Sequence, residues 1–307
     1  MEDKKPIMAI MYDFDKTLCR EDMQNYSFIP AMGMTPSEFW QKTEAFSKKT
    51  GVESILSYMY VMVETAKEKG IKMTKEWLRS LGKDISFYEG VLSWFKRINE
   101  YGESRNVIVE HYLISSGTKE IIDGCAIAKE FKAIYGCEFL FDEESDLPIW
   151  PKYAINYTMK TQYYHRISKG IIDPDDDRGL NEKQLNRRIP YRNMVYLGDG
   201  LTDVPCMILC KENGGNSIAV YQKGNKEKVT KIFEDGRVNY IASANYSKGG
   251  DLDQIVKLII DSISIKDELE KKELSLFNKQ RWFIKKSEKV NFKKKTMSIY
   301  LFYIDKV

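Results

Sequence analysis

MAIMYDFDKTL, residues 8–18, is the stretch that decides the fold of this chain. Its apolar first half predicts a buried strand over residues 6–12. Asp13 and Asp15 follow two residues apart, and alternation along an extended chain puts both carboxylates on one side. Ligands of open α/β sheets bind beyond the carboxyl ends of the strands, so this spacing favours a ligand site. Taken alone, a strand that ends in a solvated acidic turn is the alternative.

A second stretch, VYLGDGLTD at residues 195–203, repeats this design. An apolar strand leads to Asp199 between two glycines, which allow a sharp turn and a close approach of the backbone to a ligand. Asp203 by itself could simply open a helix near the positive end of its dipole. Two acidic strand ends in one chain instead favour a metal site.

A third apolar run, HYLISSGTK at residues 111–119, ends in hydroxyl groups and Gly117 just before an expected helix. Such an end presents backbone N–H groups and the Ser115 hydroxyl to an anion. A polar turn between a strand and a helix is the alternative.

A lysine at a helix start is the fourth element that we expect. Lys160, in YTMKTQYY, is the best candidate, ahead of Lys152 and Lys169. A lone surface lysine is the alternative reading of each.

The rest of the chain alternates between helical and strand patterns. Residues 23–88 carry helical periodicity, with breaks at Gly51, Gly70 and Gly82. The expected strands are 107–115, 134–141, 193–197 and 217–221, and the expected helices are 37–49, 52–69, 74–81, 91–101, 118–131, 160–168, 202–211 and 252–272. Strand followed by helix, repeatedly, predicts a parallel sheet. Residues 171–190 are expected as a charged loop, in which DPDDDRG is a solvated turn rather than a calcium site.

The composition is that of an ordinary globular protein, with 307 residues of which 43% are hydrophobic. The length favours two compact units with a sizeable buried core. No apolar stretch is long enough for a signal peptide or a membrane span, so we expect a cytoplasmic protein. Five scattered cysteines without CxxC spacing argue against disulfides and zinc, and His111 and His165 are expected to be structural or exposed.

The positive charge is concentrated in a tail. Residues 278–307 hold nine Lys and Arg residues against two acids, whereas the whole chain carries a net charge of only +3. A rival hypothesis is that this tail binds nucleic acid or an anionic membrane, with stacking or insertion by Trp282, Phe283 and Phe292. The alternative is an exposed lysine-rich helix, or a strand that packs on the core.

The order Asp-x-Asp-x-Thr, a serine after a strand, a lysine, and Gly-Asp-Gly-x-Thr-Asp resembles the haloacid dehalogenase (HAD) superfamily. The resemblance is greatest to its phosphoserine-phosphatase-like branch. It implies a Rossmann-like α/β core of residues 1–22 and 89–272, an inserted helical cap of residues 23–88, and a basic tail of residues 273–307.

The resemblance also implies a role for each candidate residue. Asp13 is the expected nucleophile, Asp15 the general acid/base, and Lys160 the cation that steadies the nucleophile and the phosphate. The expected Mg²⁺ ligands are Asp13, Asp15 through its backbone carbonyl, Asp199 and Asp203, and the expected phosphate ligands are Thr17, Ser115, Ser116 and Gly117. A carboxylate that attacks a phosphate dianion faces like-charge repulsion, which these cations relieve.

Asp15 favours phosphatase or phosphotransferase chemistry, because dehalogenases and phosphonatases of the superfamily lack an acid at that spacing. We expect hydrolysis of a small phosphorylated metabolite through an aspartyl-phosphate, with phosphotransfer as the alternative.

Phosphoserine itself is not the expected substrate. Phosphoserine phosphatases have a cap glutamate nine residues after the nucleophile, where this chain has Asp22, and Arg79 is the only arginine of residues 23–88. Six cap aromatics could bind a cationic head group or simply pack: Tyr26, Phe28, Phe39, Trp40, Tyr58 and Tyr60.

Overall fold

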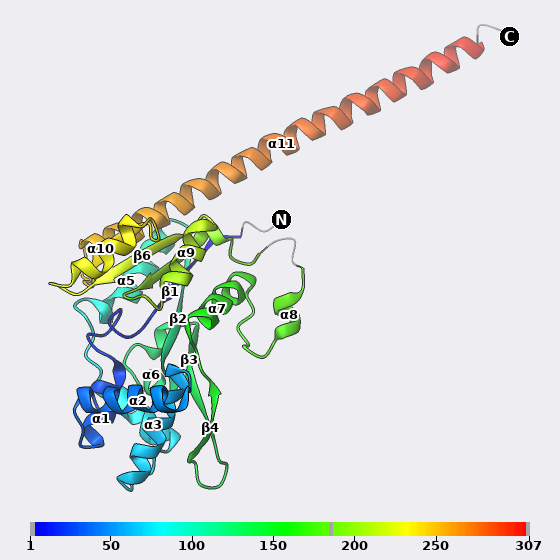
Figure 1. Cartoon of the computed structure of the whole chain (residues 1–307). Coiled ribbons are helices and arrows are strands. Elements are labelled where there is room, and N and C mark those ends of the chain that lie inside the picture. Colours follow the sequence, from blue (N-terminus) through cyan, green and yellow to red (C-terminus); the bar gives the residue numbers. More distant parts are fainter. Residues whose placement is uncertain (1–3, 184–186, 305–307) are drawn as a thin grey trace. The chain divides into compact units, whose positions relative to one another are not determined.

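One seven-stranded sheet, in the order β4-β3-β2-β1-β5-β6-β7, organises the computed structural model, which describes residues 4–183 and 187–304 and side chains as far as Arg281 (Figure 1). The strands are β1 Ile7–Tyr12, β2 Ile108–Thr118, β3 Ala133–Phe141, β4 Pro148–Tyr153, β5 Met194–Gly198, β6 Asn216–Tyr221 and β7 Tyr240–Ser243. Every neighbouring pair is parallel except β3 and β4. The prediction of a Rossmann-like α/β sheet is therefore confirmed, with β1 buried at its centre.

Helices connect most of the strands, as parallel pairing requires. They are α1 Phe28–Ala31, α2 Pro36–Thr50, α3 Ser54–Glu68, α4 Lys75–Leu81, α5 Val91–Ser104, α6 Lys119–Asp123, α7 Tyr157–Lys169, α8 Asp177–Asn181, α9 Val204–Glu212, α10 Lys226–Glu234 and α11 Asp251–Ile304. Short 3-10 turns are η1 Met23–Asn25, η2 Gly82–Asp84, η3 Ala128–Glu130 and η4 Tyr191–Asn193. None of the helices within the described residues is long and apolar enough to cross a membrane.

Several elements differ from the sequence prediction. The helix expected over residues 118–131 is wrong, because α6 ends at Asp123 and only η3 follows. Sequence patterns did not predict β4, α10 or β7. The prolines at both Pro148 and Pro151 argue against a strand, but an edge strand tolerates them because its outer N–H groups need no partner. The charged loop contains one short helix, α8.

Residues 23–88, which include α1 to α4, form a helical insert between β1 and β2 (Figure 1), and a role for them as a cap stays a prediction. Thr35 and Glu38 make a reciprocal capping box at the start of α2, and Gly51 ends that helix with a φ of 74°. The two chain segments that enter and leave the insert pair with each other. The Arg20 N–H donates to the Ser86 carbonyl at 3.3 Å, and the Tyr88 N–H donates to the Leu18 carbonyl at 3.0 Å.

The insert touches the core where α4 meets α6. A Cβ added to Gly124, just after α6, would lie 1.7 Å from the Arg79 carbonyl oxygen of α4. A Cβ added to Gly82 would lie 2.2 Å from the Ile121 carbonyl oxygen. The obstacles are backbone atoms, which cannot rotate away, so glycine is required for this approach.

The chain divides into two compact units, Met1–Ile260 and Asp261–Val307. In the second unit the described backbone is helical as far as Ile304, so the idea of a docked strand there is wrong. Trp282, Phe283 and Phe292 lie outside the described side chains. The hypothesis that the tail binds a polyanion or a membrane stays a prediction.

We predict that Gly124→Ala lowers the free energy of unfolding by about 2–3 kcal/mol, because α4 and α6 must move apart. Urea-induced unfolding monitored by tryptophan fluorescence measures it. Gly250→Ala is the control, since its Cβ would be no closer than 3.4 Å to a neighbouring atom, and it should cost less than about 1 kcal/mol. Equal stability of the two variants would show that α4 and α6 do not approach this closely.

Candidate active site

Three aspartates converge at the carboxyl ends of β1 and β5, which are neighbours in the sheet. Asp13 directly follows β1, and its backbone N–H donates to the Leu197 carbonyl of β5 at 2.9 Å. Asp199 follows β5, and Asp203 immediately precedes α9. One carboxylate oxygen from each of the three lies within 4.8 Å of the other two. The parallel pairing of β1 and β5 thus brings together residues that are far apart in the sequence.

Lys160 of α7 joins two of these carboxylates. Its Nζ donates to Asp13 Oδ1 and to Asp203 Oδ1, each at 2.7 Å, and its side chain is 1% exposed. The Asn156 side chain caps the start of α7 by accepting from the Met159 N–H, and so fixes the turn that carries the lysine. We call Asp13, Lys160 and Asp203 the buried triad.

The other two lysine candidates lie elsewhere. Lys152 of β4 pairs with Glu138 at 3.1 Å. Lys169, at the end of α7, donates to the carbonyls of Leu180 and Glu182. Of the three lysines, only Lys160 contacts Asp13.

The carboxylate of Asp203 is fully committed to neighbours. Besides Lys160, Oδ1 accepts from the Tyr196 hydroxyl at 2.8 Å, and Oδ2 accepts from the Gly200 N–H at 3.3 Å. A Cβ on Gly198 would lie 2.5 Å from the Asp203 carboxyl carbon, so glycine is needed there. Asp203 is 0% exposed, which suits it to orient Lys160 rather than to meet a ligand.

Asp199 is more open than Asp203. Its Oδ2 accepts from the half-exposed Lys228 of α10 at 3.2 Å. Neither Tyr196 nor Lys228 was recognised from the sequence: the tyrosine lies within an apolar strand, and the lysine lies on a helix whose pattern was not seen.

Asp15 lies at the boundary between the core and the helical insert. Its Oδ1 accepts from the N–H of Met23, the first residue of η1, at 2.8 Å. A Cβ on Gly117 would lie 3.2 Å from Asp15 Oδ2 and 2.0 Å from Met23 Cε, so a larger residue where β2 passes this carboxylate would displace the end of the Met23 side chain. Next to Asp15, Lys16 adopts a φ of 58° and pairs with Asp22 at 2.7 Å.

The expected phosphate ligands occupy different surroundings. Thr17 is buried and donates to Asp13 Oδ2 at 3.3 Å. Ser115 is also buried, and its hydroxyl oxygen accepts from the Gly117 N–H at 2.9 Å. The Ser116 hydroxyl oxygen has no hydrogen-bond partner among the described residues, whereas its carbonyl accepts from the Tyr58 hydroxyl at 2.7 Å. Because β2 continues to Thr118, Ser115, Ser116 and Gly117 are part of this strand rather than of the helix start that follows it.

The electrostatics of the site favour a bound cation. Burial, and then the Asp203 carboxylate, raise the pKa of Asp13 to about 7. Burial and Asp22 likewise raise the pKa of Asp15, and burial and Asp203 raise that of Asp199. Burial lowers the pKa of Lys160, but Asp13 and Asp203 outweigh it and hold that pKa above its ordinary value. Lys160 and the half-exposed Lys228 together do not offset the charge of the three aspartates, and a set of carboxylate oxygens suits a hard divalent cation.

The cysteines and the two histidines have structural surroundings. All five cysteines are buried and free. His111 bonds to the Tyr12 hydroxyl at 2.9 Å and to Asn99 Oδ1 at 3.0 Å, and burial lowers its pKa to about 3. His165 Nδ1 bonds to the Tyr191 hydroxyl at 2.5 Å.

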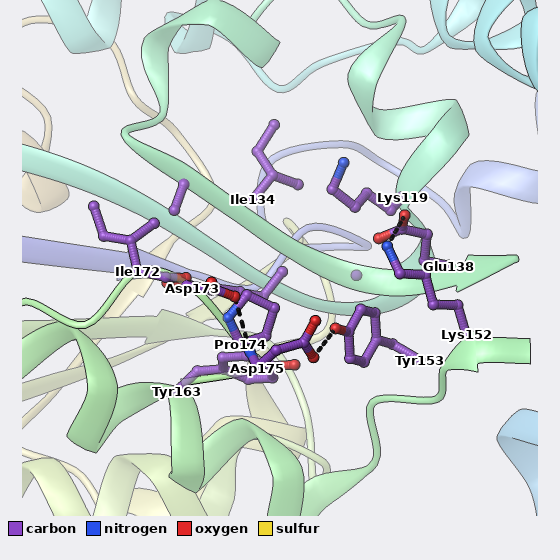
Figure 2. A pocket seen from close by; sticks show the side chains of 13 residues that line it. Lys119, Ile134, Glu138, Lys152, Tyr153, Tyr163, Ile172, Asp173, Pro174 and Asp175 are labelled. Carbon is purple, nitrogen blue, oxygen red and sulfur yellow. Dashed lines mark hydrogen bonds and ion pairs between the residues drawn. The ribbon is translucent and has the colours of Figure 1, made fainter. Parts of the chain in front are cut away.

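Of the candidate site residues, a cavity of about 280 Å³ beside β3 is lined only by Lys152, the less favoured lysine (Figure 2). Its polar side chains largely bond to one another, through the Lys152–Glu138 pair and the Tyr153–Asp175 hydrogen bond at 2.5 Å. The cavity therefore carries no sign of the chemistry that gathers around Asp13.

The sequence and the fold of this chain were compared with those of known proteins. No family model matches the sequence. A protein of Borreliella burgdorferi (strain ATCC 35210 / B31), whose description names no activity, is 29% identical over 275 residues, which are 81% of this chain and 95% of that protein.

Several solved structures share the fold. A HAD family hydrolase from Salmonella enterica serovar Typhi superposes with a TM-score of 0.52 at 14% identity, over 83% of this chain and 72% of that one. A substrate-bound phosphoserine phosphatase gives 0.52 at 15% identity, over 83% and 99%. A probable phosphoserine phosphatase from Vibrio cholerae gives 0.54 at 10% identity, over 88% and 69%. At these identities the likeness establishes a common fold.

We predict that Lys160→Met lowers the free energy of unfolding by about 3–5 kcal/mol without added metal, because two buried carboxylates lose their cation. The matched control is Lys152→Met, which removes a half-exposed pair and should cost less than about 1 kcal/mol. Urea unfolding at neutral pH measures both. Similar losses in the two variants would contradict the contacts of the buried triad.

Proposed function

We propose that this chain, which has the fold of HAD family hydrolases and phosphoserine phosphatases, is a magnesium-dependent phosphomonoesterase. The observation that carries the proposal is the buried triad beside Asp199, because it places the proposed nucleophile Asp13 next to the Lys160 cation and to Asp199, a carboxylate that could hold a metal. The substrate would be a small phosphorylated metabolite. We further propose that residues 23–88 act as the cap over this site.

In the proposed reaction Asp13 is the nucleophile. Lys160 and Thr17 each bond one of its oxygens, which orients the carboxylate, and the Lys160 charge favours its ionised form. A new bond forms between an Asp13 oxygen and phosphorus as the ester P–O bond breaks. The product of this step is an aspartyl-phosphate and the leaving alcohol.

Asp15 is the proposed general acid and base. Burial and Asp22 raise its pKa, so it can hold a proton near neutral pH, and the Met23 N–H fixes its position. It first gives this proton to the leaving oxygen. It then takes a proton from the water that attacks phosphorus and releases inorganic phosphate from Asp13.

Asp13 and Asp199 are the residues that would hold Mg²⁺, with the Asp15 backbone carbonyl as the further ligand that the resemblance implies. Asp203 is less suited to ligation because its oxygens accept three hydrogen bonds from protein groups. When bound, the ion would neutralise charge on the phosphoryl oxygens. Lys160 adds a positive charge next to Asp13, and its contact with Asp203 holds that charge in place.

Phosphotransfer is the alternative within the same geometry. The aspartyl-phosphate could pass its phosphoryl group to an alcohol in place of water, and none of the contacts above distinguishes the two acceptors. Product analysis in the presence of acceptor alcohols separates these functions: a transferase yields a new phosphate ester, and a hydrolase yields inorganic phosphate.

We predict that Asp13→Asn lowers kcat for release of phosphate from an aryl phosphate by at least about a thousandfold, because an amide cannot form the acyl-phosphate. Circular dichroism should show an unchanged fold. The control is Asp235→Asn, because Asp235 is exposed, pairs with Arg237 and is not one of the candidate site residues; this variant should keep wild-type activity. Retention of a tenth or more of the activity by Asp13→Asn would exclude Asp13 as the nucleophile.

We predict that Mg²⁺ raises the melting temperature of the wild-type protein, because ligand binding to the folded state stabilises it by about 2.7 kcal/mol at a hundred times Kd. Asp199→Asn should abolish the increase, and a chelator should abolish phosphate release. Asp177→Asn, whose side chain is 79% exposed in the charged loop, should keep the increase. The same Mg²⁺-dependent shift in Asp199→Asn would place the metal elsewhere.

A further inference from the structure

We propose that the substrate is the phosphate monoester of an amino alcohol, with an ammonium group and no carboxylate on the leaving side. The inference rests on the proposed phosphatase function and deepens it. Its basis is a cavity of about 350 Å³ that begins at Asp15 and continues between the end of β2 and the helices of the insert. The side chains that matter along it are Asp15, Asp22, Gln24, Trp40, Glu44 and Tyr58.

The cavity adjoins the proposed chemistry. Asp15, Ser116 and Gly117 line it at the core, and Trp40 of α2 and Tyr58 of α3 line it on the insert. Since Asp15 is the proposed donor of a proton to the leaving oxygen, a leaving group held beside it would extend into this space. The lining residues therefore meet the part of the substrate that distinguishes one phosphomonoester from another.

The charge of the lining excludes a carboxylate-bearing leaving group. Asp15, Asp22 and Glu44 contribute carboxylates, and no Lys, Arg or His is among the described residues that line the cavity. Recognition of a carboxylate calls for a donor such as an arginine fork, and Arg79 is exposed on α4, outside this lining. A carboxylate would also be repelled by Asp22 and Glu44, whereas Asp15 holds a proton in the proposed mechanism.

Two acidic residues already have partners outside the lining. Asp22 pairs with Lys16 at 2.7 Å, and Glu44 pairs with Lys48 at 2.6 Å across one turn of α2. The Glu44–Lys48 pair is largely exposed to solvent, so it contributes little energy that a ligand would have to replace, whereas the Asp22–Lys16 pair is only partly exposed. A substrate ammonium inside the cavity can share these carboxylates at small cost.

Two aromatic rings line the same space. Trp40 and Tyr58 lie 6.1 Å apart at an angle of 67°. Trp40 Nε1 donates to Asn25 Oδ1 at 3.2 Å and the Tyr58 hydroxyl donates to the Ser116 carbonyl, so both polar ends are engaged elsewhere. The ring carbons of both residues are thus the parts left to line the cavity, and the face of such a ring attracts a cation.

The other cap aromatics do not share this role. Phe28 and Phe39 are fully buried against each other, and Tyr60 stacks on Phe46 at 4.4 Å. The Tyr26 hydroxyl accepts from the Arg20 and Glu21 N–H groups. The structure thus separates two candidate cation-binding rings from four that pack or bond elsewhere.

Gln24 supplies an independent sign of a ligand with N–H donors. It lines the cavity, is 1% exposed, and its Nε2 donates to Thr118 Oγ1 at 3.4 Å. Its Oε1 is buried and has no hydrogen-bond partner among the described residues. A buried acceptor without a donor is unfavourable, and a primary ammonium group supplies the missing N–H.

The experiment compares three phosphomonoesters in the presence of Mg²⁺: phosphoethanolamine, O-phospho-L-serine and glycerol 3-phosphate. For wild-type protein we expect kcat/KM for phosphoethanolamine to exceed that for the other two by at least about tenfold. Isothermal titration of Asp13→Asn with the same esters measures their binding without turnover, and the same order is expected.

Glu44→Arg tests the lining directly. It places a guanidinium where the cavity has a carboxylate, so the ratio of kcat/KM for phosphoethanolamine to that for phosphoserine should fall by about tenfold. Glu64→Arg is the matched control, because Glu64 is a helix-surface glutamate paired with Lys67 and lies outside this lining. Its ratio should stay at the wild-type value.

The outcomes separate this inference from the proposed function. Turnover without a preference for phosphoethanolamine, or with a preference for phosphoserine, overturns the inference and leaves the phosphatase in place. Tighter binding of phosphoethanolamine by a protein that hydrolyses neither these esters nor an aryl phosphate overturns the phosphatase, and the cavity would then bind amino-alcohol phosphates as ligands rather than as substrates. Neither turnover nor preferential binding overturns both.

Discussion

The contacts of one buried ammonium group with two buried carboxylates constrain this structure most strongly. Lys160 comes from α7, Asp13 from the end of β1, and Asp203 from the start of α9, and each of the three is almost completely withdrawn from water. Removing a charge from water is costly unless a partner compensates it, so the sheet and both helices must hold these groups at hydrogen-bond distance. The same arrangement leaves a surplus of negative charge, which gives a divalent cation a reason to bind.

The second constraint is that the backbone passes close to neighbouring groups at several positions, and glycine leaves the space that this requires. Gly198 leaves room for the Asp203 carboxylate, and Gly117 leaves room for Met23 and Asp15. Further away, Gly124 lets α6 meet α4 and holds the helical insert against the core. The insert and β2 together line the cavity that begins at Asp15, so the proposed general acid and the residues proposed to select the substrate lie side by side.

Those parts of the fold that depend on local sequence could be predicted. Alternation and apolar runs identified β1 and β5, and parallel topology then implied that Asp13 and Asp199 would converge. The sequence favours Lys160 over Lys152 and Lys169, but only the folded chain shows that Lys160 contacts Asp13 while Lys152 pairs with Glu138 on an edge strand. The helix expected over residues 118–131 failed because contact with α4 requires Gly124, and no local signal reveals that contact. Trp40 and Tyr58 recur at helical spacing like their packed neighbours, so only the folded chain shows which rings line a cavity.

The central claim is that Asp13 carries the phosphoryl group during turnover. Mixing the wild-type protein with Mg²⁺ and excess aryl phosphate, quenching in acid within milliseconds and sequencing the peptides by mass spectrometry tests this claim directly. The account predicts one added phosphoryl group, located on Asp13, that disappears on treatment with hydroxylamine as an acyl-phosphate should. Phosphate release at a normal rate with the label on a serine such as Ser115, or with no labelled peptide at any quench time, would contradict it.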